Sequence, residues 1–250
     1  SGMESQITDK RVRQLESAYL QRRSSDLGSY MAGQPWRQYA FAHLGRLRGQ
    51  RVLDVACGYS MTPVYMALAG AEVWAVDVSR SALDLVEQYA HDRGAGHKVH
   101  TYQGAAEDLP FVANYFDLAF GGAALHHLQL DRFAIELKRV LRIGGKAAFQ
   151  DPLGENLLLE FIRDKIEYRN RHAIKGTDRP LRFSQVDQFG KQFNYYEYRT
   201  FDCLSMIAKG LHLRKTSPIR GWLHSADRLM FQAIPVTQRL ARFVVTCVVR

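Results

Sequence analysis

Two acidic residues in the central part of the chain have positions that suit the binding of a polar ligand. Asp54 lies within one short apolar run, and Asp77 ends a second run nineteen residues beyond Gly58. The small residues around Gly58 predict a tight turn between a strand and a helix, where a ligand can approach the backbone and free N–H groups. An acid at the tip of the second strand suits hydrogen bonding to ribose hydroxyls.

A second group of side chains could move a proton. His126 and His127 follow a later apolar strand, and Asp151 ends the next one. Imidazole titrates near neutrality, so we predict His127 and Asp151 as catalytic residues and His126 as a substrate contact. A structural role for His127 and a turn-capping role for Asp151 stay open. These residues have no metal-site spacing, and we expect no bound metal.

Elements that alternate between strand and helix must position these residues. From 51 to 150 apolar strands alternate with amphipathic helices, which predicts a parallel sheet covered on both faces. Ser79 is the expected N-cap of a helix over 80–92, and Asp131 that of the following helix. We expect Gly144 and Gly145 to end that helix before a strand over 146–150.

Composition limits the class of protein. The 250 residues are 46% hydrophobic and carry a net charge of +9, with 17 Lys and Arg against 15 Asp and Glu in 1–150, and 17 against 10 in 151–250. The basic excess could favour an anionic partner or be a solvated surface. The three cysteines are far apart, which favours reduced thiols and a cytoplasmic location, and no apolar run is long enough to span a membrane. The chain begins Ser1-Gly2, which suggests an appended pair before Met3.

Four motifs in order resemble a known family. They are 52–58 (VLDVACG), 104–111 (GAAEDLPF), 115–120 with 124–128 (YFDLAF, ALHHL) and 137–145 (LKRVLRIGG). Together they resemble the class I S-adenosylmethionine-dependent methyltransferases, in the ubiquinone/menaquinone C-methyltransferase-like branch that also holds natural-product methyltransferases. The resemblance implies an α/β Rossmann-like fold. Its sheet would have seven strands, parallel except for an antiparallel C-terminal hairpin, with helices on both faces and helical cap insertions.

The resemblance also implies how S-adenosylmethionine is held. Asp54 would hold the methionine ammonium, Asp77 the ribose, and Gly121 would lie near the carboxypropyl chain. The other implied contacts are the backbone at Ala56 and Gly58 for the methionine part, Val78 beside the adenine, and Ala106 and Glu107 at the adenine edge.

Three positions depart from the family pattern: Ala56 and Ser60 stand where glycine is usual, and Ala105 where an Asp often binds the adenine amino group. Small side chains suit the turn if φ stays negative. Glu107, Asp108 or a backbone carbonyl could bind the adenine amino group in place of an Asp.

Three regions are expected: cap helices in 1–48, a cofactor-binding core in 49–152, and substrate-cap insertions with the last two strands in 153–250. We predict Tyr19, Tyr30 and Trp36 in the wall of a substrate pocket, although they could equally be packing residues. The expected helices cover 4–22, 36–47, 155–170, 184–192, 202–210 and 226–233, with breaks at 24–28 and 33–35 and a loop over 214–221. Strands over 195–200 and 243–249 would form the hairpin, although a helix over 236–249 stays open.

The favoured function is methyl transfer from S-adenosylmethionine to a hydroxyl or amine of a small organic acceptor, such as a secondary metabolite. One alternative is methylation of RNA or protein by the basic C-terminal part. It is weakened because Gly121–Ala124 stands where base methyltransferases often carry an Asn-Pro-Pro-Tyr-type motif. A second alternative is a non-catalytic cofactor-binding scaffold, which the three departures suggest. The sequence is compatible with a monomer or a homodimer.

Overall fold

The computed structural model describes residues 26–156, 179–206 and 217–250. The expected helix over 4–22 lies outside the described residues, as do Tyr19, most of the helix expected over 155–170 and the end of that expected over 202–210.

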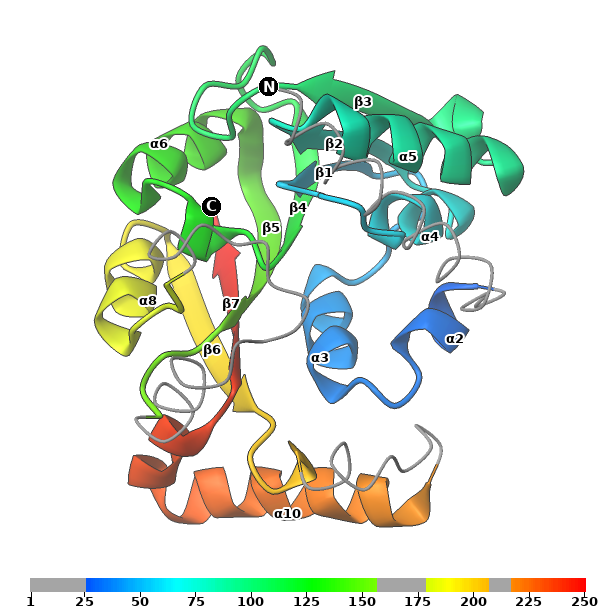
Figure 1. Ribbon diagram of the computed structural model, residues 1–250. Coiled ribbons are helices and arrows are strands. Elements are labelled where there is room, and N and C mark those ends of the chain that lie inside the picture. The colour runs from blue at the N-terminus through cyan, green and yellow to red at the C-terminus, as the bar shows by residue number, and fades with distance from the viewer. Residues whose placement is uncertain (1–25, 157–178, 207–216) are drawn as a thin grey trace, which may run out of the picture.

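A single seven-stranded sheet organises the molecule (Figure 1). Its strands stand in the order β3-β2-β1-β4-β5-β7-β6; β1 to β5 are parallel, whereas β7 is antiparallel to both β5 and β6. This confirms the predicted fold class and the C-terminal hairpin. The strands are β1 (Arg51–Val55), β2 (Glu72–Asp77), β3 (Val99–Gln103), β4 (Phe116–Gly122), β5 (Leu141–Pro152), β6 (Tyr195–Phe201) and β7 (Phe243–Val249).

Helices cover both faces of the sheet (Figure 1). Successive strand residues alternate between two apolar cores: Val52 belongs to the core shared with α3, α4 and α5, and Leu53 to the core shared with α6 and α8. The described helices are α2 (Leu27–Met31), α3 (Pro35–Leu44), α4 (Thr62–Leu68), α5 (Arg80–Asp92), α6 (Leu130–Val140), α8 (Phe183–Gly190) and α10 (Pro218–Ala233). Short 3₁₀ turns are η1 (Gly96–Lys98), η2 (Leu125–His127) and η3 (Pro235–Leu240).

The ends of α6 differ from the sequence prediction. Asp131 lies in the first turn of α6, and the N-cap is Gln129, whose side chain makes no capping bond. Gly144 and Gly145 lie inside β5 rather than at the helix end, because β5 begins at Leu141, directly after α6. The pairing of β4 with β5 is irregular there, and a Cβ on Gly145 would lie 2.8 Å from the Arg142 carbonyl oxygen. The glycines therefore accommodate an irregular strand.

Other boundaries moved for local reasons. Asp26 accepts a hydrogen bond from the Ser29 amide at 2.8 Å and starts α2 inside an expected break. Gly45, at φ +78°, ends α3 three residues before the predicted end at 47. The helix expected over 226–233 begins instead at Pro218, within the expected loop, because proline suits the first helical turn. Ser79 caps α5 as predicted, since its hydroxyl accepts a hydrogen bond from the Ala82 amide.

Candidate functional site

The end of β1 contains a buried carboxylate oxygen for which the described residues provide no hydrogen-bond donor. Asp54 is 1% exposed, and its Oδ2 has no hydrogen-bond partner in the described part of the chain. Burial raises the pKa of Asp54 well above its ordinary value, and the neighbouring Asp77 raises it further. A buried acceptor of this kind is costly unless a donor fills it, so this position fits a bound donor or cation.

Asp77 fixes the shape of the same turn. Its Oδ2 accepts a hydrogen bond from the Gly58 amide at 2.8 Å, and its Oδ1 accepts one from the Ser79 amide at 2.9 Å. The carboxylate thus ties the β1–α4 turn to the end of β2. Asp54 and Asp77, which the sequence placed at neighbouring strand ends, do lie close enough to interact electrostatically.

The backbone of this turn is left-handed at two positions. Gly58 has φ +52°, which glycine adopts freely, and Ala56 has φ +48°. The condition under which a small side chain suits the turn, a negative φ, is therefore not met at Ala56. Left-handed φ at alanine costs about 1 kcal/mol. Ser60 has a separate role, because its Oγ accepts a hydrogen bond from the Thr62 amide at 3.0 Å at the start of α4.

The residues predicted beside the rest of the cofactor also lie at the strand ends. Gly121, in β4, has no room for a side chain, since a Cβ would lie 2.7 Å from the Phe149 ring. Val78 follows β2 and is 70% exposed, and Ala106 is buried. Glu107 accepts a hydrogen bond from the Gln129 amide at 2.8 Å. One oxygen of Glu107 therefore holds the start of α6, and the assignment of Ala106 and Glu107 to an adenine edge stays a prediction.

A histidine–aspartate pair lies at the end of β5. Asp151 Oδ1 accepts a hydrogen bond from the His126 backbone amide at 3.2 Å, and it lies 2.8 Å from His126 Nδ1. The side chains of His126 and Asp151 are almost fully buried, at 3% and 1% exposed, and Asp151 Oδ2 has no partner among the described residues. Because β1 and β5 run in the same direction in one sheet, Asp54 and Asp151 both lie toward the carboxyl ends of the strands. In each of them Oδ2 has no hydrogen-bond partner among the described residues.

The structure brings Asp151 to His126 rather than to His127. The two imidazole rings lie 3.9 Å apart between centroids, but His127 is exposed. A carboxylate that accepts from Nδ1–H fixes the tautomer in which Nε2 can take a proton. The sequence singled out all three residues, but their pairing depends on η2 turning back over β5, which spacing does not specify.

The predicted pocket aromatics make packing contacts. Tyr30 donates to or accepts from Thr62 Oγ1 at 2.7 Å and stacks on Tyr65 at 4.4 Å between centroids. Trp36 Nε1 donates to the Gln34 side chain, and its ring lies 6.3 Å from that of Phe243. Tyr30 thus lies over the start of α4, beside the turn. Thr62, which is 3% exposed, is a residue of this region that sequence reasoning missed.

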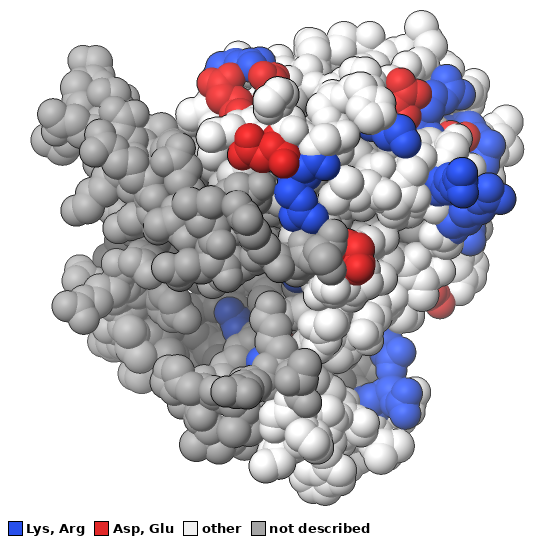
Figure 2. Space-filling view, turned by 90° about the vertical axis from the view of Figure 1, so that its right-hand side faces the viewer, with Lys and Arg blue, Asp and Glu red and all other residues white. Residues whose placement is uncertain are grey.

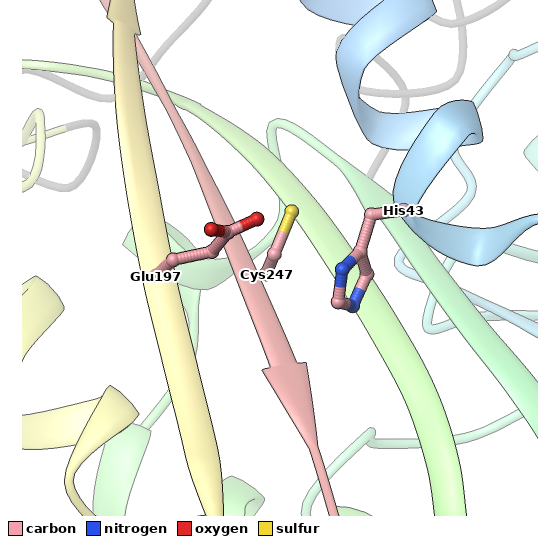
Figure 3. A group of neighbouring side chains, drawn as sticks. All are labelled: His43, Glu197 and Cys247. Carbon is pink, nitrogen blue, oxygen red and sulfur yellow. The ribbon is translucent and has the colours of Figure 1, made fainter.

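A separate polar group lies between α3 and the hairpin. Figure 3 shows His43, Glu197 and Cys247 facing one another, and their potential metal-binding atoms lie within 4.8 Å. Glu197 already accepts hydrogen bonds from the hydroxyls of Tyr39 at 2.8 Å and Tyr195 at 3.0 Å. Burial raises the pKa of Cys247 to about 12, so the thiol stays protonated. We interpret this group as a contact that holds α3 on β6 and β7.

The described surface beside α4 and α5 carries mixed charge. Figure 2 shows Lys and Arg interspersed with Asp and Glu on that side of the molecule. Arg80 of α5, for example, pairs with Asp84 at 2.7 Å and with Glu87 at 2.9 Å. The described residues in this view form no continuous basic groove.

Known proteins resemble the central part of the chain. Residues 53–149 match the family model described as a methyltransferase domain. An uncharacterized methyltransferase, sll0829, of Synechocystis is 37% identical over 120 residues, which cover 46% of this chain and 53% of that protein. The ubiquinone/menaquinone C-methyltransferase UbiE of Yersinia enterocolitica is 32% identical over 147 residues, which cover 57% and 55%. The chain thus spans about half the length of the curated relatives it matches.

Solved structures share the fold over most of the chain. A geranyl diphosphate C-methyltransferase from Streptomyces coelicolor superposes with a TM-score of 0.58 at 15% identity, covering 85% of this chain and 78% of that one. A putative sarcosine dimethylglycine methyltransferase from Galdieria sulphuraria gives 0.57 at 14% identity, covering 88% and 85%. The similarity extends beyond residues 53–149 and includes parts of the C-terminal region.

Proposed function

We propose that the chain transfers a methyl group from S-adenosylmethionine to a small organic acceptor. The premise is that residues 53–149 are a class I S-adenosylmethionine-dependent methyltransferase domain. The proposal rests on Asp54 Oδ2, which is buried and has no hydrogen-bond donor among the described residues. It lies beside a turn that Asp77 holds in place. The cofactor, when bound, supplies a methyl group on a positively charged sulfur. Two neighbouring carboxylates give the turn a negative potential, which fits a cationic ligand.

Each residue of the turn has a proposed part in binding. Asp54 would accept from the methionine ammonium, and Asp77 would bind the ribose while it keeps the Gly58 amide in place. Gly121 allows the Phe149 ring to pack directly on β4, and we place it near the carboxypropyl chain because the family resemblance implies it. Methyl transfer needs mainly an aligned and desolvated acceptor, so most of the work of the protein is positioning.

We propose that the His126–Asp151 pair removes a proton from a hydroxyl or amine acceptor. Asp151 would hold the imidazole through Nδ1, and Nε2 would take the proton. His127, the base favoured from sequence, lies exposed beside it and remains the alternative. The name of the UbiE relative favours a carbon acceptor as the second candidate. Proton removal from the acceptor would then follow or accompany C–C bond formation.

Calorimetric titration with S-adenosylmethionine and S-adenosylhomocysteine tests the cofactor site. We expect wild-type binding that Asp77→Ala weakens at least tenfold, about 1.4 kcal/mol. Asp92→Ala, which removes an exposed acid from the end of α5, is the matched control and should bind normally. Absence of wild-type binding would contradict the proposal and favour the scaffold alternative.

A second experiment separates the two histidines. Release of S-adenosylhomocysteine is measured across pH with panels of phenols, amines and quinols, and with bulk RNA. His126→Gln should lower turnover, whereas His127→Gln should leave turnover close to that of wild type. The reverse result would restore His127 as the base, and activity on RNA alone would overturn the small-molecule proposal.

A further inference from the structure

The inward side of α10 carries charged residues beside an apolar contact with the core. Its buried residues are Arg220, Asp227 and Phe231, two of which are charged. Asp227 accepts hydrogen bonds from the backbone amides of residues 203, 204 and 205, at 3.1, 2.6 and 3.1 Å. His224 lies 3.6 Å from Asp202, with a side chain only 13% exposed. Polar contacts therefore hold α10 on the end of β6.

The opposite side of the helix is apolar and open. We call the outward-facing large residues of α10 and η3 the α10 apolar face: Ile219, Trp222, Leu229, Ile234, Val236 and Leu240, which are 44–71% exposed. Ala226 and Ala233 complete a helical stripe with Ile219, Trp222 and Leu229 at spacings of three and four residues. Figure 1 shows α10 across the lower end of the molecule, with no described element beyond it.

Large exposed apolar side chains are grouped more closely on this face than on the rest of the described surface. Among the described residues, the large exposed apolar side chains outside it are scattered over α4, α6 and several loops and strands. Single exposed apolar residues need no explanation, but a contiguous apolar patch marks an interaction site. Within the described part of the chain, α10 packs on the core through a different side, which carries Asp227 and Phe231.

The charge around the face indicates what kind of partner it fits. Residues 218–240, which form α10 and η3, contain three arginines and one acidic residue, Asp227, which is 3% exposed. Arg228 and Arg239 are exposed on α10 and η3. The lower part of the described surface in Figure 2, where α10 lies, shows basic and uncharged groups and no acidic ones.

We propose that the α10 apolar face binds the surface of an anionic lipid bilayer, with α10 lying in the interface plane. Trp, Leu and Ile on one face with arginines beside them suit the boundary between headgroups and acyl chains. Two copies meeting through this face would oppose equal positive charges, and α10 and η3 expose no acid to pair with them, whereas anionic headgroups complement them. No helix in the described ranges is long and apolar enough to cross a bilayer, which fits surface attachment.

Co-sedimentation of the full chain with vesicles tests the proposal. Vesicles of phosphatidylcholine with about 30% phosphatidylglycerol are compared with pure phosphatidylcholine, in about 0.1 M and 0.5 M salt. We expect the chain to prefer the anionic vesicles at least fivefold in low salt, and to lose that preference in high salt. Trp222 fluorescence should shift to the blue on binding, and Trp222→Phe should remove the shift.

Matched variants locate the binding surface. Trp222→Gln with Leu229→Gln should weaken binding at least tenfold, and Arg228→Gln with Arg239→Gln should remove the preference for anionic vesicles. Val112→Gln with Ile143→Gln removes two side chains that are 70% and 79% exposed elsewhere, and should bind like wild type. Unchanged thermal unfolding and cofactor titration would show that the variants are folded.

Three outcomes would overturn the proposal. Wild type could fail to sediment with both kinds of vesicle, or the control pair could lose as much binding as the α10 pair. Light scattering could instead show a dimer that the α10 pair dissociates, which would assign the face to a second copy. None of these results depends on methyltransferase activity, so this proposal and the proposed function can fail separately.

Discussion

Asp54 at the end of β1 and Asp227 in the middle of α10 are both buried carboxylates, but they differ in the hydrogen bonds that the protein donates to them. Three backbone amides donate to Asp227, whereas Asp54 Oδ2 has no partner in the described part of the chain. Hydrogen bonds within the fold offset the cost of burying Asp227, whereas a bound ligand would have to offset the cost of burying Asp54. An incompletely satisfied group therefore identifies the binding site more directly than its residue type does.

The same contrast holds for apolar surface in α6 and α10. α6 buries Phe133, Leu137 and Val140 against the sheet, whereas α10 buries two charged residues together with Phe231 and exposes an apolar stripe. Both helices are amphipathic, so the pattern along the sequence is similar in kind. Periodicity therefore predicts a helix, whereas the elements packed against the helix determine which side is covered.

The largest effect is expected at the buried face of α6. Leu137 is fully buried, so Leu137→Ala should lower the free energy of unfolding by about 2–5 kcal/mol, because the substitution removes buried apolar surface and leaves a residual cavity. Chemical denaturation measures this change. A decrease no larger than that of an exposed leucine would show that α6 does not pack as described.

Asp227→Ala should have the next largest effect. It leaves the amides of residues 203–205 without their buried acceptor, which should cost about 2–4 kcal/mol of unfolding free energy. Asp227→Asn, which retains one acceptor oxygen, should cost less. Equal stability of wild type and Asp227→Ala in urea denaturation would remove the structural role assigned to this carboxylate.

Asp54→Asn should change how stability depends on pH. Because burial and Asp77 raise the folded-state pKa of Asp54, its protonated form favours folding below its unfolded pKa of about 3.9, and this contribution is lost as pH rises through the raised folded-state value. The variant without cofactor should therefore gain stability relative to wild type as pH rises above about 4.

Urea denaturation at several pH values measures the Asp54→Asn effect. Parallel curves for the two proteins would contradict the raised pKa. Calorimetry of the same variant should show weaker cofactor binding, because a neutral side-chain amide offers the ammonium one acceptor oxygen and no negative charge.

The smallest stability effect is expected on the open side of α10. Leu229 is 61% exposed, and Leu229→Ala should change the unfolding free energy by no more than about 0.5 kcal/mol. Thermal and chemical denaturation check this beside Leu137→Ala. A decrease of several kcal/mol would mean that the side chain packs within the chain, and would also remove the basis of the lipid-binding proposal.

Much of the core could be predicted from sequence because its signals are local. Apolar runs of strand length alternate with helical stripes between β1 and β5, and the turn residues and Asp77 follow at fixed offsets. The boundaries that moved depended on less regular features. Gly144 and Gly145 are typical of a helix end, but here they lie in an irregular part of β5 whose shape depends on pairing with β4.

Local patterns in the sequence specify the parallel core and the acids at the strand ends, because strand and helix periods and strand-end positions are properties of neighbouring residues. The family resemblance, rather than a local pattern, indicated the two hairpin strands. The folded arrangement is what pairs Asp151 with His126, brings Glu197 to the tyrosine of α3, and turns the apolar stripe of α10 outward. These outcomes depend on how elements far apart in the chain are oriented against each other. That orientation follows from the packing of all elements together, so no local pattern specifies it.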